Sequence, residues 1–278
     1  MSPIAYVIMA LFGLAFGSFL NVCICRIPAE ESVIFPGSRC PNCGHAIRWR
    51  DNIPVLSYCL LRGRCRDCHK RISVQYPMVE VLTAAIFVLE LARYGLTPEL
   101  LKNTVFALLI VILIFTDLRE RRIPHVVTLF GIIAGLMLST LIPIDDRPVG
   151  WVLRHWGFLP GETVLSFLGA LTGAMFGGGL FYGVGEAFYR LRHKEGLGFG
   201  DVMMMLMTGT FLGPVLTLLT ILLGSLLGTA VALILLITNK KYRDYQWPYG
   251  TFLGIAAIYA SLGGEALIRA YLHWAGFR

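Results

Sequence analysis

Residues 198–237 read GFGDVMMMLMTGTFLGPVLTLLTILLGSLLGTAVALILLI, and Asp201 is the only charged residue among them. A helix needs about 20 apolar residues to cross a hydrocarbon layer about 30 Å thick. Residues 215–237 reach that length, whereas residues 202–212 would rise only about 16 Å as a helix. Gly213-Pro214 lies between them, and such a pair interrupts a helix. The stretch therefore predicts a short and a full-length membrane helix joined by a tight turn, with one kinked helix as the alternative.

The composition of the whole chain agrees with a membrane protein. Of its 278 residues, 56% are hydrophobic and 15% are charged, and the mean hydropathy is +0.69. A soluble domain carries about 25% charged residues. The net charge of +7 comes from basic residues in loops rather than on one soluble face, which argues against nucleic-acid binding. We predict an all-α polytopic membrane protein with about eight transmembrane helices, the sixth short, at about 4–24, 78–94, 100–116, 123–142, 162–189, 202–212, 215–237 and 249–274.

The positions of the basic residues predict the orientation in the membrane. With eight helices, one side of the membrane receives eighteen of the 24 Lys and Arg residues, in loops 26–77, 118–124, 190–200 and 239–248. Lys and Arg collect in cytoplasmic loops. A seven-helix arrangement would place Lys240, Lys241 and Arg243 on the outer side, so we prefer eight. No basic residue precedes the first apolar segment, which is typical of an anchor with its N-terminus outside rather than of a cleaved signal.

Glycines spaced four apart mark one face of the predicted fifth helix: Gly169, Gly173 and Gly177. Helices in lipid associate by close packing, and small residues let their backbones approach. We therefore expect this face to contact another helix.

Two Cys-x-x-Cys pairs lie in the polar stretch 26–77, separated by 21 residues. Tetrahedral zinc binds four thiolates, and two such pairs supply them. A loop of about fifty residues with few apolar runs needs a metal to stabilise its fold. Two disulfides or a redox pair are the alternatives, although disulfides conflict with a reducing cytoplasm. The sequence predicts a small zinc-binding cytoplasmic domain between the first and second helices, with these ligands: Cys40, Cys43, Cys65 and Cys68.

Two aspartates are predicted at the same membrane depth, although 84 residues separate them. Asp117 ends the third apolar segment and Asp201 begins the sixth, so both would lie at the cytoplasmic boundary. Two adjacent carboxylates share a proton, and one can act as base on a water while the other acts as acid on a carbonyl. Gly198 and Gly200 would let a substrate strand approach closely. This pattern predicts peptide hydrolysis without a metal or a covalent intermediate.

Other interpretations of these carboxylates remain open. Asp201 is a plausible N-cap for the sixth helix. Asp117 could form an ion pair with Arg119 or with the next two arginines. Glu80, at the cytoplasmic end of the second helix, is a candidate to support the site.

Several motifs in order give the chain a resemblance to the type IV prepilin peptidase family over nearly its whole length. The sequence contains GxGD, the second aspartate motif of that family, as GFGD at 198–201, and DLR at 117–119 with IP at 123–124 is similar to the first. The others are GSFLNV at 17–22, FPGSRCPNC at 35–43, DNIP at 51–54, YP at 76–77 with Glu80, and PYGTFL at 248–253.

This resemblance implies an enzyme of the bacterial inner membrane. It would cleave the short basic leader of type IV prepilins or pseudopilins after a glycine, at the cytoplasmic face, among membrane lipids. It would then methylate the new N-terminus with S-adenosylmethionine. In the family, this activity is associated with the loop that contains the cysteines, residues 26–77 here, called the cysteine loop or zinc loop below. The implied catalytic pair is Asp117 and Asp201, supported by Arg119, Gly198, Gly200 and Glu80. The chain would comprise a first helix (1–25), the zinc loop (26–77) and an aspartyl protease domain (78–278).

One position departs from the family pattern. Many members have lysine two residues after the second aspartate, where this chain has Met203. A non-catalytic membrane scaffold or secretion subunit with a zinc loop is therefore one alternative. A presenilin-like intramembrane protease is another, because it shares Gly-x-Gly-Asp, although the zinc loop and the boundary position of both aspartates argue against it.

Overall fold

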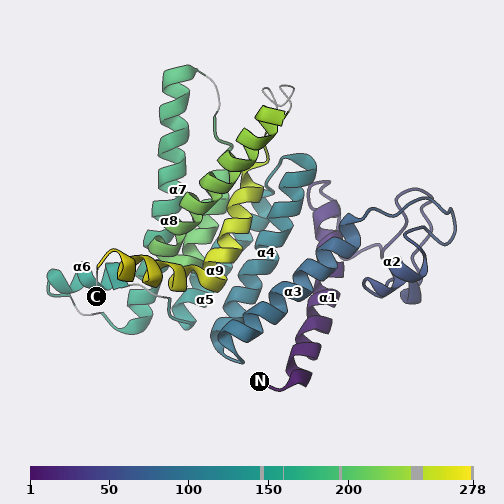
Figure 1. Ribbon diagram of the computed structural model, residues 1–278, viewed down its shortest axis with the longest axis horizontal. Helices are drawn as coiled ribbons and strands as arrows, with labels where there is room; N and C mark the ends of the chain where they lie inside the picture. The colour runs from purple at the N-terminus through teal and green to yellow at the C-terminus, as the bar shows by residue number, and fades with distance from the viewer. Residues whose placement is uncertain (145–146, 159, 194–195, 239–246, 277–278) are drawn as a thin grey trace. The chain divides into compact units, whose positions relative to one another are not determined.

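The computed structural model describes residues 1–144, 147–158, 160–193, 196–238 and 247–276, and their regular secondary structure is almost entirely helical (Figure 1). Within those ranges the extended backbone is limited to two isolated bridges, Arg39 with Ala46 and Arg64 with Arg71. The helices are α1 (Pro3–Arg26), the 3-10 turn η1 (Trp49–Asp51), α2 (Leu56–Leu60), α3 (Gln75–Tyr94), α4 (Pro98–Glu120), α5 (His125–Leu141), α6 (Arg147–His155), α7 (Glu162–Arg192), α8 (Phe199–Thr238) and α9 (Tyr249–Trp274).

The predicted all-α membrane architecture is confirmed. Six helices are long and apolar enough to cross a membrane: α1, α3, α4, α7, α8 and α9; α5 is a shorter apolar helix. The chain is therefore a multi-pass membrane protein, and eight crossings remains a prediction. The short helices η1, α2 and α6 were not predicted, because none of them contains a long apolar run. Lys240, Lys241 and Arg243, which support the predicted orientation, lie outside the described residues.

Helix α8 turns back on itself at Gly213, whose φ of 71° and ψ of 179° are not helical. Twelve residues separate Met205 from Thr217, which corresponds to about 18 Å along a continuous helix. Yet the Met205 carbonyl oxygen and Thr217 Cγ2 lie 2.7 and 2.8 Å from the position that a Cβ on Gly177 would occupy. The predicted turn at Gly213-Pro214 is therefore present, between two helical arms of unequal length.

The chain forms two compact units, residues 1–100 and 101–278. In the first unit α1 packs against α3, with the cysteine loop between them in sequence. A Cβ on Gly13 would lie 2.5 Å from Ala84 Cα, and one on Gly17 would lie 2.6 Å from Glu80 Cα. Small residues therefore let the two helix backbones approach closely.

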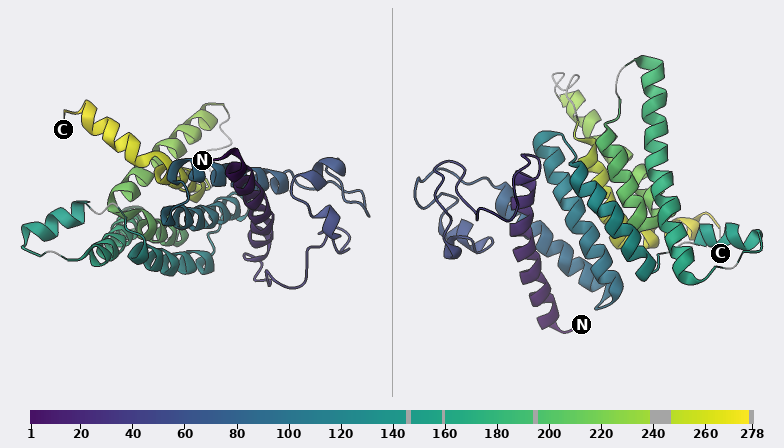
Figure 2. Two further views of the ribbon diagram at one scale, coloured as in Figure 1. Left: turned by 90° about the horizontal axis from the view of Figure 1, so that it is seen from below. Right: turned by 180° about the vertical axis from the view of Figure 1, so that it is seen from behind.

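In the second unit α8 packs against α5, α7 and α9, and Figure 2 shows these helices from two further directions. The glycine face predicted on α7 is a contact face. A Cβ on Gly173 would collide with the backbone of Gly209 and Gly213, and Gly169 is buried as well. On α9, a Cβ on Gly254 would lie 2.5 Å from Ile114 of α4. This close packing holds the ends of α4, α8 and α9 near one another.

Candidate active site and metal centre

Asp117 and Asp201 come from two helix ends and meet at the beginning of α9. Asp117 lies three residues before the end of α4, and Asp201 is the third residue of α8. Asp117 Oδ2 and Asp201 Oδ1 each lie 3.2 Å from the position that a Cβ on Gly250 would occupy. One water molecule or one carbonyl oxygen could therefore contact both carboxylates. Asp117 is only 6% exposed, whereas Asp201 is partly exposed.

Thr251, the residue after Gly250, binds the Asp117 carboxylate directly. Its backbone N–H donates to Asp117 Oδ2 at 2.8 Å, and its hydroxyl donates to the same oxygen at 3.0 Å. The first N–H groups of a helix have no partner within it; that of Thr251 has Asp117 as its nearer acceptor and the carbonyl of Pro248, at 3.2 Å, as a second one. Thr251 lies in the PYGTFL motif at 248–253, but the sequence predicted no role for it in the site. The two residues are 134 positions apart, and no local spacing rule connects them.

The two glycines before Asp201 have different surroundings. A Cβ on Gly200 would lie 2.8 Å from Ile123 Cβ, so Gly200 lets the start of α8 pack against the segment between α4 and α5. A Cβ on Gly198 would lie 3.4 Å from Asp201 Oδ2. Helix α8 begins at Phe199, so Asp201 lies within its first turn rather than at the N-cap position.

The other two supporting candidates make different contacts. Arg119 lies 3.6 Å from the carboxylate of Glu120, its neighbour on α4. Glu80 belongs to the first unit, where it is 7% exposed and its Oε2 accepts a hydrogen bond from the N–H of Val55 at 2.7 Å. Val55 has a φ of 60°, a left-handed conformation that is unfavourable for a β-branched residue. Glu80 therefore ties the cysteine loop to α3.

The four cysteines of the two pairs lie together, as the sequence predicted. Their sulfur atoms are all within 4.8 Å of one another, and the Sγ atoms of Cys40 and Cys68 are 3.9 Å apart. Tetrahedral zinc with Zn–S bonds of about 2.3 Å would set the sulfurs about 3.8 Å apart. Burial raises the pKa of the Cys40 thiol, but hydrogen bonds from the backbone of Asn42 and Cys43 and from the thiols of Cys43 and Cys65 outweigh it and lower the pKa to about 7. The cluster therefore has the donor atoms and the size that a metal ion requires.

The two pairs are closed by equivalent hydrogen bonds. The N–H of Cys40 donates to the carbonyl of His45 at 3.0 Å, and the N–H of Cys65 donates to the carbonyl of Lys70 at 2.9 Å. In each pair the first cysteine thus bonds to the residue five positions later. This matching geometry turns two sulfurs from each pair toward a common centre.

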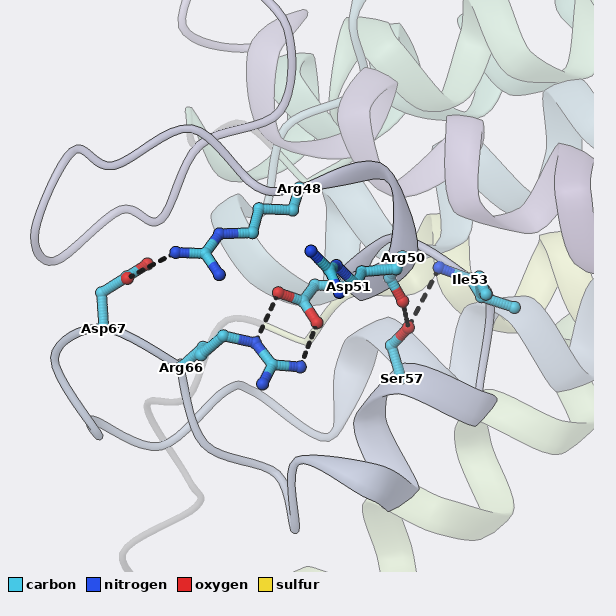
Figure 3. Close-up of polar contacts among 7 residues, drawn as sticks. All are labelled: Arg48, Arg50, Asp51, Ile53, Ser57, Arg66 and Asp67. Carbon is cyan, nitrogen blue, oxygen red and sulfur yellow. Dashed lines mark hydrogen bonds and ion pairs between the residues drawn. The ribbon is translucent and has the colours of Figure 1, made fainter.

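Ion pairs connect η1 and the residue before it to the second cysteine pair (Figure 3). Arg66 binds both carboxylate oxygens of Asp51, at 2.8 and 2.6 Å, and Arg48 lies 4.0 Å from Asp67. The hydrogen bonds from Arg66 hold the pKa of Asp51 below its ordinary value. Because Arg66 and Asp67 lie between Cys65 and Cys68, these contacts fix the second pair relative to η1.

Comparisons with known proteins agree with this architecture. Residues 11–94 match the bacterial peptidase A24 N-terminal domain, and residues 104–233 match the type IV leader peptidase family. Several relatives carry the name prepilin leader peptidase/N-methyltransferase, among them the following three. The protein from Myxococcus xanthus is 37% identical over 86% of this chain and 65% of its own length. The protein from Pseudomonas putida is 31% identical over 100% of this chain and 97% of its own length. The protein from Bacillus subtilis is 28% identical, with 96% and 98% covered.

No solved structure matches the chain. The relatives nevertheless align across both units, and the two family descriptions cover successive parts of the sequence. The chain belongs to the type IV leader peptidase family.

Proposed function

We propose that this protein is a membrane aspartic endopeptidase that removes the short basic leader of type IV prepilins and pseudopilins after a glycine. The observation that carries the proposal is the convergence of Asp117 and Asp201 at Gly250. The names of the relatives, prepilin leader peptidase/N-methyltransferase, support the substrate class. Because a prepilin has an apolar helix that lies in the bilayer, its leader would emerge at the membrane surface, where we propose that these helix ends lie.

The proposed chemistry needs only the two carboxylates and a water molecule. Carboxylates this close do not both ionise easily, so the pair holds one proton between them. The ionised member accepts a proton from water as the water attacks the peptide carbonyl carbon, and the protonated member donates to the carbonyl oxygen. Burial of Asp117 and partial burial of Asp201 strengthen these interactions, because the local dielectric constant is lower than that of water.

Supporting roles follow from the contacts of the remaining candidates. Gly198 leaves space beside the Asp201 carboxylate, and Gly200 sets the start of α8 against Ile123. Arg119 places a positive charge in the last turn of α4, where it interacts favourably with the negative end of the helix dipole. Glu80 holds the cysteine loop on α3.

We propose that a structural zinc ion stabilises the fold of the loop by joining its two halves. Its ligands would be Cys40, Cys43, Cys65 and Cys68. S-adenosylmethionine would be the co-substrate for methylation of the new N-terminus, with the cysteine loop contributing to that second activity. The proposed organisation is a first helix (1–25), the zinc loop (26–77) and the protease domain (78–278). We place the protein in the bacterial inner membrane, among its lipids, with the N-terminus outside and both sites cytoplasmic.

The alternative of a non-catalytic scaffold rests on Met203, which is partly exposed and stands where the resemblance implies lysine. A presenilin-like protease would use the same two aspartates but would cut within the membrane span. Cleavage of a defined prepilin distinguishes these alternatives, because each predicts different products.

The test is cleavage of a purified prepilin by the purified chain in detergent or lipid, with products identified by mass spectrometry. We expect the native protein to release the leader intact, and the variants Asp117→Asn and Asp201→Asn to release none. Glu162→Gln, at an exposed acid in the first turn of α7, is the matched control and should cleave normally. Cleavage by both aspartate variants would refute the mechanism. Inactivity of the native chain on several prepilins would favour the scaffold, and a cut within the apolar helix would favour the presenilin-like protease.

A further inference from the structure

The contacts around the two carboxylates are unequal. Thr251 donates two hydrogen bonds to Asp117 Oδ2, whereas the Asp201 carboxylate accepts one backbone hydrogen bond, from Gly198. Asp117 Oδ2 and Asp201 Oδ1 lie equally close to Gly250. Hydrogen bonds donated to a carboxylate favour its ionised form, and bonds to a charged acceptor are about twice as strong as those between neutral groups. Where the pair shares one proton, the Thr251 bonds therefore favour Asp117 as the ionised member and leave the proton on Asp201.

We infer that Thr251 is a positioning residue that assigns the two roles, with Asp117 as the general base and Asp201 as the general acid, a role that rests on the proposed function. Both bonds end on Oδ2, the Asp117 oxygen that lies with Asp201 Oδ1 beside Gly250, and they hold the carboxylate in a fixed orientation there. Because Thr251 is 4% exposed, bulk water does not compete strongly for its hydroxyl.

The resulting reaction is balanced in atoms and charge. Water oxygen forms a bond to the carbonyl carbon while its proton moves to Asp117, and the Asp201 proton moves to the carbonyl oxygen. The tetrahedral intermediate then breaks its C–N bond as Asp117 returns its proton to the leaving nitrogen. Asp201 recovers a proton from one hydroxyl as the new carboxyl group forms, and both aspartates return to their starting states.

The Thr251 hydroxyl has a second acceptor within reach, which defines the competing explanation. Its Oγ1 lies 3.3 Å from the carbonyl oxygen of Ile114, one turn before Asp117 on α4. A hydroxyl carries one proton, and the shorter bond to the carboxylate is the stronger one. If the proton instead went to Ile114, Thr251 would stabilise the contact between α4 and α9 without affecting the chemistry.

The experiment compares Thr251→Val, which keeps the shape and loses the hydroxyl, with Thr251→Ser, which keeps the hydroxyl and loses a methyl group. The full-length variants are assayed in lipid on a purified prepilin, with kcat and KM determined separately. We expect Thr251→Val to lower kcat by about tenfold or more with KM unchanged, and Thr251→Ser to retain most of the native kcat. Thr220→Val removes another buried hydroxyl, which bonds to the Leu216 carbonyl, and should leave kcat unchanged.

A purely structural role predicts the opposite order, because valine fills the space of threonine and serine leaves a gap. Native kcat in Thr251→Val, or equally low kcat in Thr251→Val and Thr251→Ser, would overturn the inference. Thermal unfolding of each variant identifies a loss of fold. If Thr251→Val does not fold, Thr251→Ser decides: a retained kcat supports the inference, and a lost kcat overturns it. The variants Asp117→Asn and Asp201→Asn are run in parallel. If they still cleave, the proposed function fails, whereas if they are inactive and Thr251→Val is not, only the role of Thr251 fails.

Discussion

The cysteine loop and helix α4 are ordered by different means. Of residues 26–77, all of which the structure describes, only Cys40, Ser57 and Gly63 are buried. Trp49 in the same loop is 82% exposed. In α4, by contrast, every residue from 109 to 117 is buried, including the proposed catalytic Asp117. A helix buried on all sides is held by its neighbours, whereas a loop with so small a core depends on its cross-links.

This difference suggests that the two proposed sites are built separately. The sulfur cluster is formed by two hydrogen-bonded turns within one stretch of chain. The aspartate pair is formed by three helix ends from distant parts of the sequence. Damage to the cluster should therefore disorder the loop and leave the second unit folded. Damage to helix packing in the second unit should destabilise that unit and leave the loop ordered.

Metal removal should produce the largest effect, because a structural zinc site contributes about 10–16 kcal/mol to folding in small domains. We expect a chelator, or Cys43→Ser with Cys68→Ser, to make residues 26–77 sensitive to protease. The second unit should keep its thermal unfolding transition. Limited proteolysis and metal analysis by mass spectrometry would measure both. Cys59→Ser, at an exposed cysteine outside the cluster, should bind metal normally. If the loop stays resistant to protease without metal, the loop does not depend on the metal for its order, which would contradict the difference drawn between the loop and α4.

A smaller effect should follow from overfilling the contact between α7 and α8. A Cβ on Gly173 would overlap the backbone of Gly209 and Gly213, so Gly173→Ala should lower the free energy of unfolding by about 1–3 kcal/mol. Gly179→Ala, on the same helix with nothing within 4 Å, should not lower it. Thermal unfolding in detergent compares them, while metal content should stay constant in both. Equal melting temperatures would show that close packing does not stabilise the second unit.

The smallest effect concerns the attachment of the loop to α3. Glu80→Ala removes the acceptor for the N–H of Val55, and losing the partner of a partly buried donor costs about 1 kcal/mol. Glu80→Gln keeps an acceptor oxygen and should be less disruptive. Hydrogen exchange at residues 50–60 should increase in the alanine variant and stay near native in the glutamine variant. The same increase in both would mean that the charge, rather than the acceptor, holds the loop.

Much of the fold could be predicted from sequence because its signals are local. Runs of apolar residues identify the long helices, Gly213-Pro214 identifies the reversal in α8, and the spacing of the cysteines identifies the cluster. The short helices η1, α2 and α6 were missed, since they are too short to produce an apolar run.

The candidate site could be predicted only in part, for a physical reason. Asp117 and Asp201 are recognisable because charged residues at the ends of apolar segments are costly. Gly250 and Thr251 lie in the PYGTFL motif at 248–253, but the contacts that give them a role appear only when α9 packs between α4 and α8. That arrangement depends on contacts between residues 134 positions apart, which hydropathy and spacing do not encode.

The most direct test of the central claim, that the peptide bond is hydrolysed in the space between the two carboxylates, is the cleavage rate of Gly250→Ala. The added methyl group would lie 3.2 Å from an oxygen of each aspartate and 2.8 Å from Ile123 Cδ1. Gly263→Ala on the same helix, whose nearest neighbour is the Tyr259 ring at 3.8 Å, is the control. We expect Gly250→Ala to remain folded and bind metal but to lose nearly all leader release, with Gly263→Ala near native. A folded Gly250→Ala that cleaves prepilin at the native rate would contradict this account.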